Sequence, residues 1–354
     1  MNVRRTQWLW TVLMLSLGVG IGTTIYLGLK KNVNAQLASA SVLEEISEST
    51  EQPVVAIPIT GPLADRDAEI SGLAWYEDWL IMLPQYPGRL NDQIFALAKS
   101  DILAFLQGET SAPLAPEPIA LTSPDFANEI EGFEGFEAIA FRGQRAFLTI
   151  EAEAGGSATG YVVASVLADD LSELVVDPLS IAESSAQSSS PNKADEAIVL
   201  TQEAVISIYE VHGVAVNPTP QAHRFDFELN ALPAIAFPNV EYRLTDATAL
   251  DERDRFWAIN YFYTGDRDLL PLRDPLTIRY GRGPTHRQQR TVERLVEFEY
   301  RSEGIRLTNT APIQLELAKS GRNWEGIARL EDQGFLLVTD KFPDTILGFV
   351  ALPE

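Results

Sequence analysis

The amino-acid sequence predicts an all-β fold: a single β-propeller of six blades, with five as the alternative, preceded by an N-terminal hydrophobic helix. Three features indicate this fold. An uncharged apolar stretch lies near the N-terminus, short β-branched or aromatic runs broken by Gly, Pro and Asp follow it, and one hairpin unit recurs five times. We expect residues 1–35 to be a signal peptide or membrane anchor, residues 36–52 a flexible tether, and residues 53–354 the propeller domain.

The N-terminal segment has a basic start, Arg4–Arg5, followed by an uncharged apolar stretch over residues 8–29. That stretch is long enough to cross a bilayer of about 30 Å as a helix. Val33–Asn34–Ala35 also fits the small-residue rule for signal-peptide cleavage, so the leader is either a retained anchor or is removed near Ala35. A buried core helix is the less favoured alternative. Both favoured hypotheses predict an extracytoplasmic, for example periplasmic, protein, with membrane contact through residues 8–29 if the leader is retained.

The composition is globular and strongly acidic, with 27 Lys and Arg residues against 50 Asp and Glu residues and a net charge of -23. Residues 1–35 hold four basic and no acidic residues, so the exported part is near -27. Such a charge repels phosphate backbones and excludes nucleic acid as a general partner, whereas it attracts cations such as Ca²⁺. The absence of cysteine excludes disulfides, thiolate nucleophiles and Cys-ligated metal sites. No feature identifies a protein partner.

The repeated unit starts with a polar residue, continues with a small and an apolar residue, and after a turn ends on a second apolar run and another polar residue. The two polar residues are 14 positions apart in four copies and 15 in the fifth. We interpret each copy as a hairpin of two antiparallel strands. The copies begin and end at Ser71 and Gln85, Glu137 and Glu151, Glu196 and Glu210, Asp246 and Asn260, and Glu325 and Asp340.

The spacing of the copies, 50 to 79 residues, allows two further strands in each period, as a propeller blade requires. The longest interval leaves room for a degenerate sixth blade around Leu295–Leu307. We expect Val54–Thr60 to pair with the closing blade near Ile346–Leu352. Ordinary hairpins of a β-sandwich are the alternative, but the sequence has no linker between two halves.

The polar ends of the hairpins are candidate metal ligands, because equivalent positions of successive blades meet around the channel of a propeller. Like charges gathered there need a neutralising partner, and Ca²⁺ binds 6–8 oxygen ligands. The alternative is that these side chains cap strand ends through backbone amides. The candidate Ca²⁺ ligands are Glu137, Glu151, Glu196, Glu210, Asp246, Asn260, Glu325 and Asp340.

A basic segment over residues 273–290 offers a candidate anion site, with Arg282 and Arg287 as its most probable ligands for a small anionic ester. Arginine forks match phosphate oxygens, although a solvated loop on an acidic surface is the alternative. No Gly-x-Ser-x-Gly, Walker, His-Glu-x-x-His or EF-hand motif is present, so the sequence assigns no catalytic residue.

Three segments are similar to motifs of phytase-like, or esterase-like, β-propeller proteins: Asn323–Asp340, Ile70–Ala74 and Leu244–Leu250. The resemblance implies an extracytoplasmic six-bladed propeller, often associated with calcium, that hydrolyses phosphate or carboxylic esters. The first hairpin departs from the family pattern, because it ends Leu83–Pro84–Gln85 and lacks the acidic end and the Arg that follows it. Two functions remain: a metal-assisted ester hydrolase, exported or tethered to a membrane, and a non-enzymatic binding or scaffold module.

Overall fold

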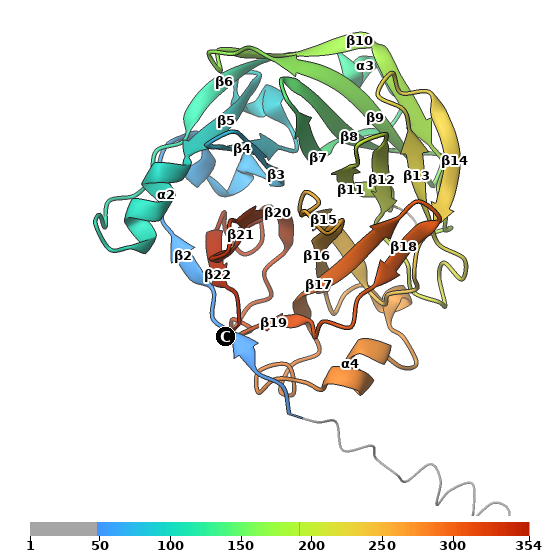
Figure 1. Ribbon diagram of the computed structural model, residues 1–354. Helices are drawn as coiled ribbons and strands as arrows, with labels where there is room; N and C mark the ends of the chain where they lie inside the picture. Colours follow the sequence, from blue (N-terminus) through green and yellow to red (C-terminus); the bar gives the residue numbers. More distant parts are fainter. Residues whose placement is uncertain (1–47, 191, 354) are drawn as a thin grey trace, which may run out of the picture. The chain divides into compact units, whose positions relative to one another are not determined.

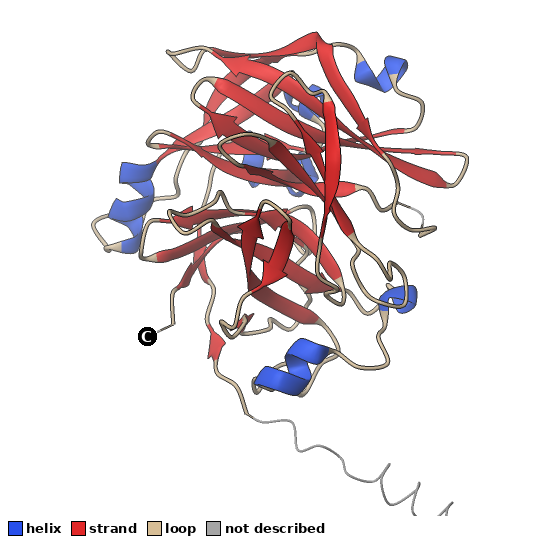
Figure 2. Ribbon diagram, turned by 45° about the vertical axis from the view of Figure 1, so that its right-hand side comes forward, coloured by secondary structure: helices blue, strands red, loops and turns tan. Residues whose placement is uncertain are grey.

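The computed structural model describes residues 48–190 and 192–353, which form one compact all-β unit starting at Glu48. Figure 1 shows its strands gathered around a common centre, and Figure 2 shows the helices at the periphery. The helices are α2 (Lys99–Leu106), α3 (Phe126–Glu129) and α4 (Pro275–Tyr280). Four single-turn 3-10 helices lie at Pro62–Ala64, Arg66–Ala68, Pro87–Leu90 and Arg267–Leu269.

The strands fall into five antiparallel groups in chain order. The first holds β3 (Ile70–Tyr76), β4 (Trp79–Pro84), β5 (Gln93–Ala98) and β6 (Glu117–Thr122). The second holds β7 (Phe133–Arg142), β8 (Arg145–Ala154), β9 (Ser157–Leu167) and β10 (Glu173–Ser184). The third holds β11 (Asp195–Leu200), β12 (Val205–Tyr209), β13 (Gln221–Phe225) and β14 (Ala231–Ala236).

The fourth group holds β15 (Arg243–Ala247), β16 (Arg255–Phe262) and β17 (Val292–Arg301), with β18 (Gly304–Leu307) and β19 (Ile313–Leu315) both on the far edge of β17. The fifth holds β20 (Trp324–Leu330), β21 (Gly334–Thr339) and β22 (Leu347–Ala351), and is completed by the N-terminal β2 (Val55–Ile57). β1 (Glu51–Gln52) pairs in parallel with β19.

The innermost strands of the five groups form a closed ring. β3 packs against β7, β7 against β11, β11 against β15, β15 against β20, and β20 against β3. Figure 1 shows these five strands nearest the centre. Radial groups around a ring are the architecture of a β-propeller, so the predicted all-β propeller-like fold is confirmed at this level.

The hydrophobic core consists of five layers between neighbouring groups and a sixth cluster at the ends of the third and fourth groups, so both faces of every group are covered. β4 shows this best: Ile81 and Leu83 pack toward the second group, whereas Leu80 and Met82 pack toward the fifth. Burial of alternate residues on opposite faces explains why strands such as β4 are almost continuously apolar.

Two expectations about the ends of the domain have different outcomes. Pairing of the N-terminal segment with the last strands is confirmed, since Val55 lies opposite Phe349 and Ile57 opposite Leu347. The degenerate sixth blade around Leu295–Leu307 is wrong: this segment is the end of β17 together with β18, and β17 pairs along its length with β16.

Residues 1–47, where the signal peptide or anchor was predicted, lie outside the described residues. In the part of the chain that is described, no helix is long and apolar enough to cross a membrane. The last residues of the predicted tether belong to the folded unit. Glu51 is buried in it and accepts hydrogen bonds from the backbone of Thr285 (3.1 Å) and His286 (3.0 Å).

Candidate functional site

A β-bulge lies near the start of each inner strand, and the first polar residue of each repeated hairpin lies in it. The register shifts fall between Ile70 and Gly72, Phe136 and Ile139, Asp195 and Ala197, Leu244 and Ala247, and Trp324 and Gly326. A bulge inserts one extra residue and re-aims its side chain. The five bulges hold Ser71, Glu137, Glu196, Asp246 and Glu325, all buried.

The small residue that follows each of these polar residues allows the inner strands to approach closely. A Cβ on Gly72 would lie 3.2 Å from the backbone of Glu137 and Ala138 in the next group. A Cβ on Gly326 would lie 3.2 Å from the Leu73 backbone nitrogen. The repeated sequence pattern is therefore explained by the geometry of a tight ring of strands.

Five glutamates from three groups form the channel cluster: Glu137, Glu151, Glu196, Glu210 and Glu325. None is more than 6% exposed. Each is close enough to others of the set to influence their ionisation: Glu137 to Glu151, Glu210 and Glu325, and Glu196 to Glu137, Glu210 and Glu325. The predicted convergence of the hairpin ends is thus found for these five residues.

Two cations, neither of them predicted, lie in the cluster. Arg243, the first residue of β15, forms a salt bridge with Glu210 and a second one with Glu325, at 3.4 Å between Nη2 and Oε1. Lys193 Nζ lies 3.4 Å from Glu210 Oε2. Glu210 is therefore the carboxylate of the channel cluster that both cations contact. Arg243 precedes the repeated unit by three positions, so a comparison of equivalent positions does not single it out.

The other glutamates of the cluster have raised pKa values. Burial, followed by the charge of Glu210, raises the pKa of Glu151 to about 7, although Lys193 and Arg243 act against the rise. Burial raises the pKa of Glu325 to about 8 against the lowering effect of Arg243. The pKa values of Glu137 and Glu196 are also well above normal, mainly because of burial and neighbouring carboxylates. The cluster therefore combines carboxyls with raised pKa values and Glu210, which both cations contact.

Two buried oxygens of the cluster, Glu151 Oε1 and Glu325 Oε2, have no partner among the described residues. Glu210 Oε2 accepts no hydrogen bond either, but it pairs with Lys193 Nζ at 3.4 Å. By contrast, Glu137 Oε1 accepts a hydrogen bond from Gln85 Nε2 (2.9 Å), and Glu325 Oε1 accepts one from Asn323 Nδ2 (2.6 Å). Buried polar atoms are normally satisfied, so unpaired ones mark where a ligand or water binds.

The remaining predicted ligands have other roles. Asp246 pins inner strands together: its carboxylate accepts hydrogen bonds from the backbone of Ile327 and Ala247, both at 2.8 Å. Asn260 donates to two backbone carbonyls and accepts from Arg294 Nε at 2.7 Å. Asp340 lies near Glu325. Its carboxylate caps the turn after Asp340 by accepting a hydrogen bond from the Phe342 backbone N–H at 2.9 Å. For Asp246 the capping alternative describes the contacts.

The calcium and anion sites stay predictions, and the described residues show the surroundings of their candidate ligands. Over residues 48–190 and 192–353, no group of three or more Asp, Glu or His side chains is arranged to hold a metal ion. Arg287 is exposed and pairs with Glu48 at 2.8 Å, and the backbone of Arg282 bonds with Ser49. The cations beside the glutamates are Arg243 and Lys193 instead.

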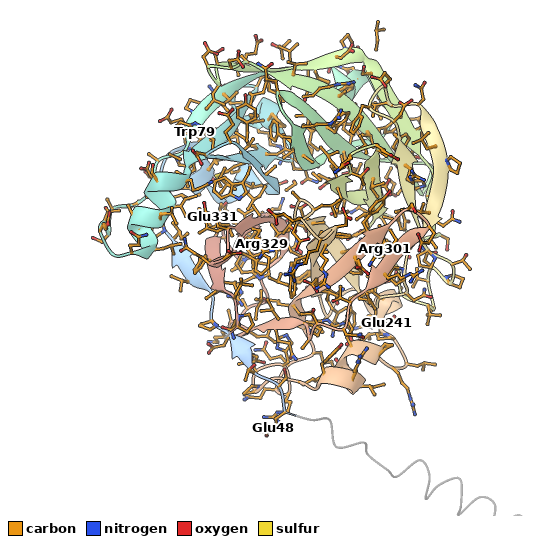
Figure 3. All side chains as sticks on the ribbon, in the orientation of Figure 1. Glu48, Trp79, Glu241, Arg301, Arg329 and Glu331 are labelled. Carbon is orange, nitrogen blue, oxygen red and sulfur yellow. The ribbon has the colours of Figure 1, made fainter. Side chains whose placement is uncertain are left out.

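The other end of the ring holds a cavity of about 760 Å³, lined by later residues of the same inner strands, such as Ala74, Ile139 and Ile198. Its rim includes Arg329 and Glu331, which Figure 3 labels near the centre of the view. The two ends of the inner strands thus differ: the first residues gather buried carboxyls, and the later ones are apolar residues that line a cavity together with charged residues such as Asp251, Arg253 and Asp332.

No protein-family model matches this chain, and no curated protein matches it. Solved structures similar to it include an α-L-arabinanase from Cellvibrio cellulosa, with 12% identity, a TM-score of 0.45, and coverage of 80% of this chain and 90% of that one. Another is a glycosyl hydrolase from Bacteroides ovatus, with 9% identity, a TM-score of 0.47 and coverage of 86% and 94%. A third is the catalytic domain of a GH62 α-L-arabinofuranosidase from Coprinopsis cinerea, with 7% identity, a TM-score of 0.44 and coverage of 86% and 97%.

The resemblance to phytase-like propellers is wrong, since these structures are glycoside hydrolases, a different family. The physical reason lies in the motifs. The packing of inner propeller strands requires three features: a polar residue in a bulge, a small residue where two strands approach closely, and a buried apolar run. Such features do not identify a family.

Proposed function

We propose that this protein is a hydrolase of glycosides, and that the channel cluster of a five-bladed propeller supplies its acid and its base. One observation carries the proposal: raised pKa values at Glu151 and Glu325, each with a buried oxygen that has no partner among the described residues, occur beside Glu210, which pairs with Arg243 and Lys193. Carboxyls whose surroundings separate their pKa values are suited to divide acid and base roles.

The chemistry of the cluster favours glycosides over esters. Glycoside cleavage needs one carboxylic acid to protonate the leaving oxygen and one carboxylate to act on the other side of the sugar. Phosphate esters are disfavoured because the chain as a whole is strongly acidic, with a net charge of -23, and Arg287, which was predicted to hold an anion, pairs with Glu48 instead. The substrate that fits is uncharged at the bond that is cleaved.

The roles follow from protonation. Glu151, with a pKa of about 7, donates its proton to the glycosidic oxygen as the bond to the anomeric carbon breaks. Glu210, which pairs with Arg243 and Lys193, stabilises the positive charge at that carbon and accepts the proton of the water that adds to it. Glu325 is a second proton donor, held through Asn323 and Arg243. The products are two hydroxyl compounds.

The alternative is an extracytoplasmic binding or scaffold module that lacks activity. The low exposure of the cluster favours it, because Glu210 is fully buried and Glu151 is only 3% exposed. In that case the glutamates hold the inner strands together, as Asp246 does.

The test is hydrolysis of a panel of p-nitrophenyl glycosides by the full chain and by Glu151→Gln and Glu210→Gln. We expect turnover of at least one glycoside and a loss of about 10²–10⁴-fold in each variant, the usual contribution of general acid–base catalysis. Glu303→Gln, at an exposed glutamate, is the control and should keep the wild-type rate. Absence of turnover on every glycoside, or wild-type rates in both variants, would favour the binding module.

A further inference from the structure

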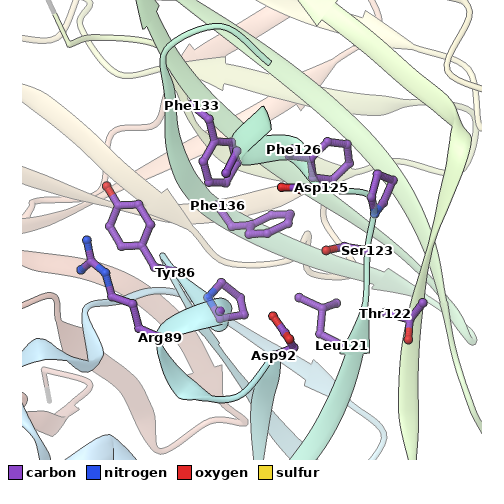
Figure 4. Close-up of a pocket in the computed structure, with 14 residues that line it drawn as sticks. Tyr86, Arg89, Asp92, Leu121, Thr122, Ser123, Asp125, Phe126, Phe133 and Phe136 are labelled. Atoms are coloured by element: carbon purple, nitrogen blue, oxygen red, sulfur yellow. The ribbon is translucent and has the colours of Figure 1, made fainter. Parts of the chain in front are cut away.

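A second cavity, of about 580 Å³, lies between the turn after β4 and the segment that joins β6 to β7 (Figure 4). This volume is in the range of small-molecule sites, about 300–1,000 Å³. Four aromatic side chains line it: Tyr86, Phe126, Phe133 and Phe136. We call it the aromatic pocket.

The walls of the aromatic pocket are fixed by packing. The rings of Phe126 and Phe133 each meet the Phe136 ring edge-to-face, at centroid distances of 6.1 Å. The Phe136 backbone N–H donates to Gln85 O at 2.9 Å and joins the two walls. Gly135 permits this contact: it has a φ of +122°, and a Cβ there would lie 2.7 Å from the same carbonyl oxygen. The pocket is therefore formed before a ligand arrives.

The aromatic pocket adjoins the channel cluster. Gln85, next to Tyr86 in the chain, donates to Glu137 Oε1 at 2.9 Å, and Phe136 directly precedes Glu137. Burial, followed by the nearby charges of Glu134 and Glu137, raises the pKa of Tyr86 to about 12. The Gln85 side chain thus connects the wall of the pocket to Glu137, although none of the five glutamates lines the pocket itself.

Polar groups surround the aromatic rings. Arg89 places its guanidinium 3.8 Å from the centre of the Tyr86 ring and forms a 3.0 Å salt bridge with Glu69. Asp92, Ser123 and Asp125 line the opposite side, and Figure 4 shows Tyr86 between Arg89 and the phenylalanines. The carboxylates of Asp92 and Asp125 can accept hydrogen bonds from the hydroxyl groups of a bound molecule, and their charge repels an anion. Aromatic faces ringed by such acceptors suit a neutral, polyhydroxylated ring, whose C–H face packs on the aromatic ring.

We propose that the aromatic pocket binds a neutral sugar ring of the substrate next to the bond that the channel cluster cleaves, with Tyr86 as the main contact. This inference rests on the proposed function for the identity of the reaction, but binding itself is separable from it.

The test measures binding without turnover. Saturation-transfer NMR and calorimetry are carried out on the full chain bearing Glu151→Gln, with methyl glycosides of glucose, galactose, mannose, xylose and arabinose as probes. Glucose 6-phosphate is the anionic probe. We expect at least one methyl glycoside to bind, a loss of tenfold or more in affinity on adding Tyr86→Ala, and wild-type affinity with Tyr86→Phe. Tyr263→Ala, at an exposed tyrosine outside the pocket, should change nothing.

The two proposals fail in different ways. Binding that depends on Tyr86 in a protein that hydrolyses no glycoside would overturn the proposed function and leave the aromatic pocket in place. If the protein hydrolyses a glycoside and the KM is the same in Tyr86→Ala and Phe133→Ala as in the wild type, the sugar-binding role of the aromatic pocket is overturned and the proposed function stands. Binding of none of the methyl glycosides, or tighter binding of glucose 6-phosphate than of every neutral probe, would also overturn the sugar-binding role.

Discussion

Two buried charge clusters at similar depth have opposite properties. In the Arg294 cluster (Asn260, Asp274, Thr277 and Arg294), Arg294 Nη1 donates to Asp274 Oδ2 at 2.7 Å, and Asp274 also accepts from Thr277 Oγ1 at 2.6 Å. Burial raises the pKa of Asp274, but Arg294 and these hydrogen bonds outweigh it and the pKa falls below normal. In the channel cluster burial prevails, and the pKa values of Glu151 and Glu325 rise.

The difference separates fully paired buried charges, which hold the fold, from incompletely paired ones, which are candidates for chemistry. Every carboxylate oxygen of Asp274 is paired, so that charge is part of the structure. The channel cluster has more carboxyls than cations and leaves oxygens unpaired, which costs stability. Functional groups with strongly shifted pKa values are expected where such a cost is retained.

The largest effect should come from the Arg294 cluster. Arg294→Met leaves Asp274 buried without its cation, and we expect the free energy of unfolding to fall by about 3–5 kcal/mol. Denaturant unfolding measures this loss. Arg306→Met is the control: Arg306 pairs with Glu303 on the surface, so this substitution should change the free energy of unfolding by less than about 0.5 kcal/mol. Equal small losses in both variants would remove the distinction between the clusters.

Arg243→Met should have a smaller effect on stability and a larger one on ionisation. Lys193 remains beside Glu210, so we expect a loss of about 1–3 kcal/mol. The pKa values of Glu151 and Glu325 should rise further, because Arg243 lowers both, and the rate–pH profile should move to higher pH. Arg243→Lys retains the charge and should restore most of the profile. An unmoved profile in Arg243→Met would contradict the role assigned to this arginine.

Stability should also depend on pH through the channel cluster. A glutamate whose folded pKa is raised binds a proton more tightly in the folded state, so its stabilisation is present at low pH and is lost as pH rises from about 4.5 through the folded pKa. Between pH 5 and 7, Glu151 should lower the free energy of unfolding by roughly 1.4 kcal/mol per pH unit at most. Glu151→Gln should flatten this slope and stabilise the protein above pH 7. Identical slopes in the two proteins would refute the shift.

The smallest expected effect is that of calcium. Arg243 and Lys193 provide the positive charge of the cluster, and no metal-binding group is formed by the residues that the structure describes. We expect the melting temperature to be the same with millimolar Ca²⁺ and with EDTA. A rise of several degrees with Ca²⁺ would restore the calcium site predicted from the sequence.

The repeated hairpins could be predicted from the sequence because each inner strand needs particular residue types at fixed positions. The bulge takes a polar residue, the close approach to the next strand takes a small residue, and the buried strand takes apolar residues. Glu137, Glu196 and Glu325 were identified in this way. The number of groups was harder to predict, because the long loop and helix between β16 and β17 stretch one period and imitate a missing blade.

Arg243 and Lys193 could not be found from the pattern, since each occurs in one group only and pairs with a residue remote in sequence. Nor could the roles of Asp246 and Asn260 be separated from those of the glutamates. Asp246 and Asn260 occupy the same positions in the repeat as the glutamates do. Whether a polar side chain at such a position contacts a backbone group or another side chain depends on its length and on the neighbouring strands.

The most direct test of the central claim is a carbon-13 NMR titration of the glutamate side-chain carboxyls in the wild-type chain and in Glu151→Gln. We expect resonances that titrate near pH 7 and pH 8, with the one near pH 7 absent from the variant. If every glutamate carboxyl titrates between about pH 4 and 5, as unperturbed groups do, the channel cluster holds no proton donor at neutral pH and the account fails.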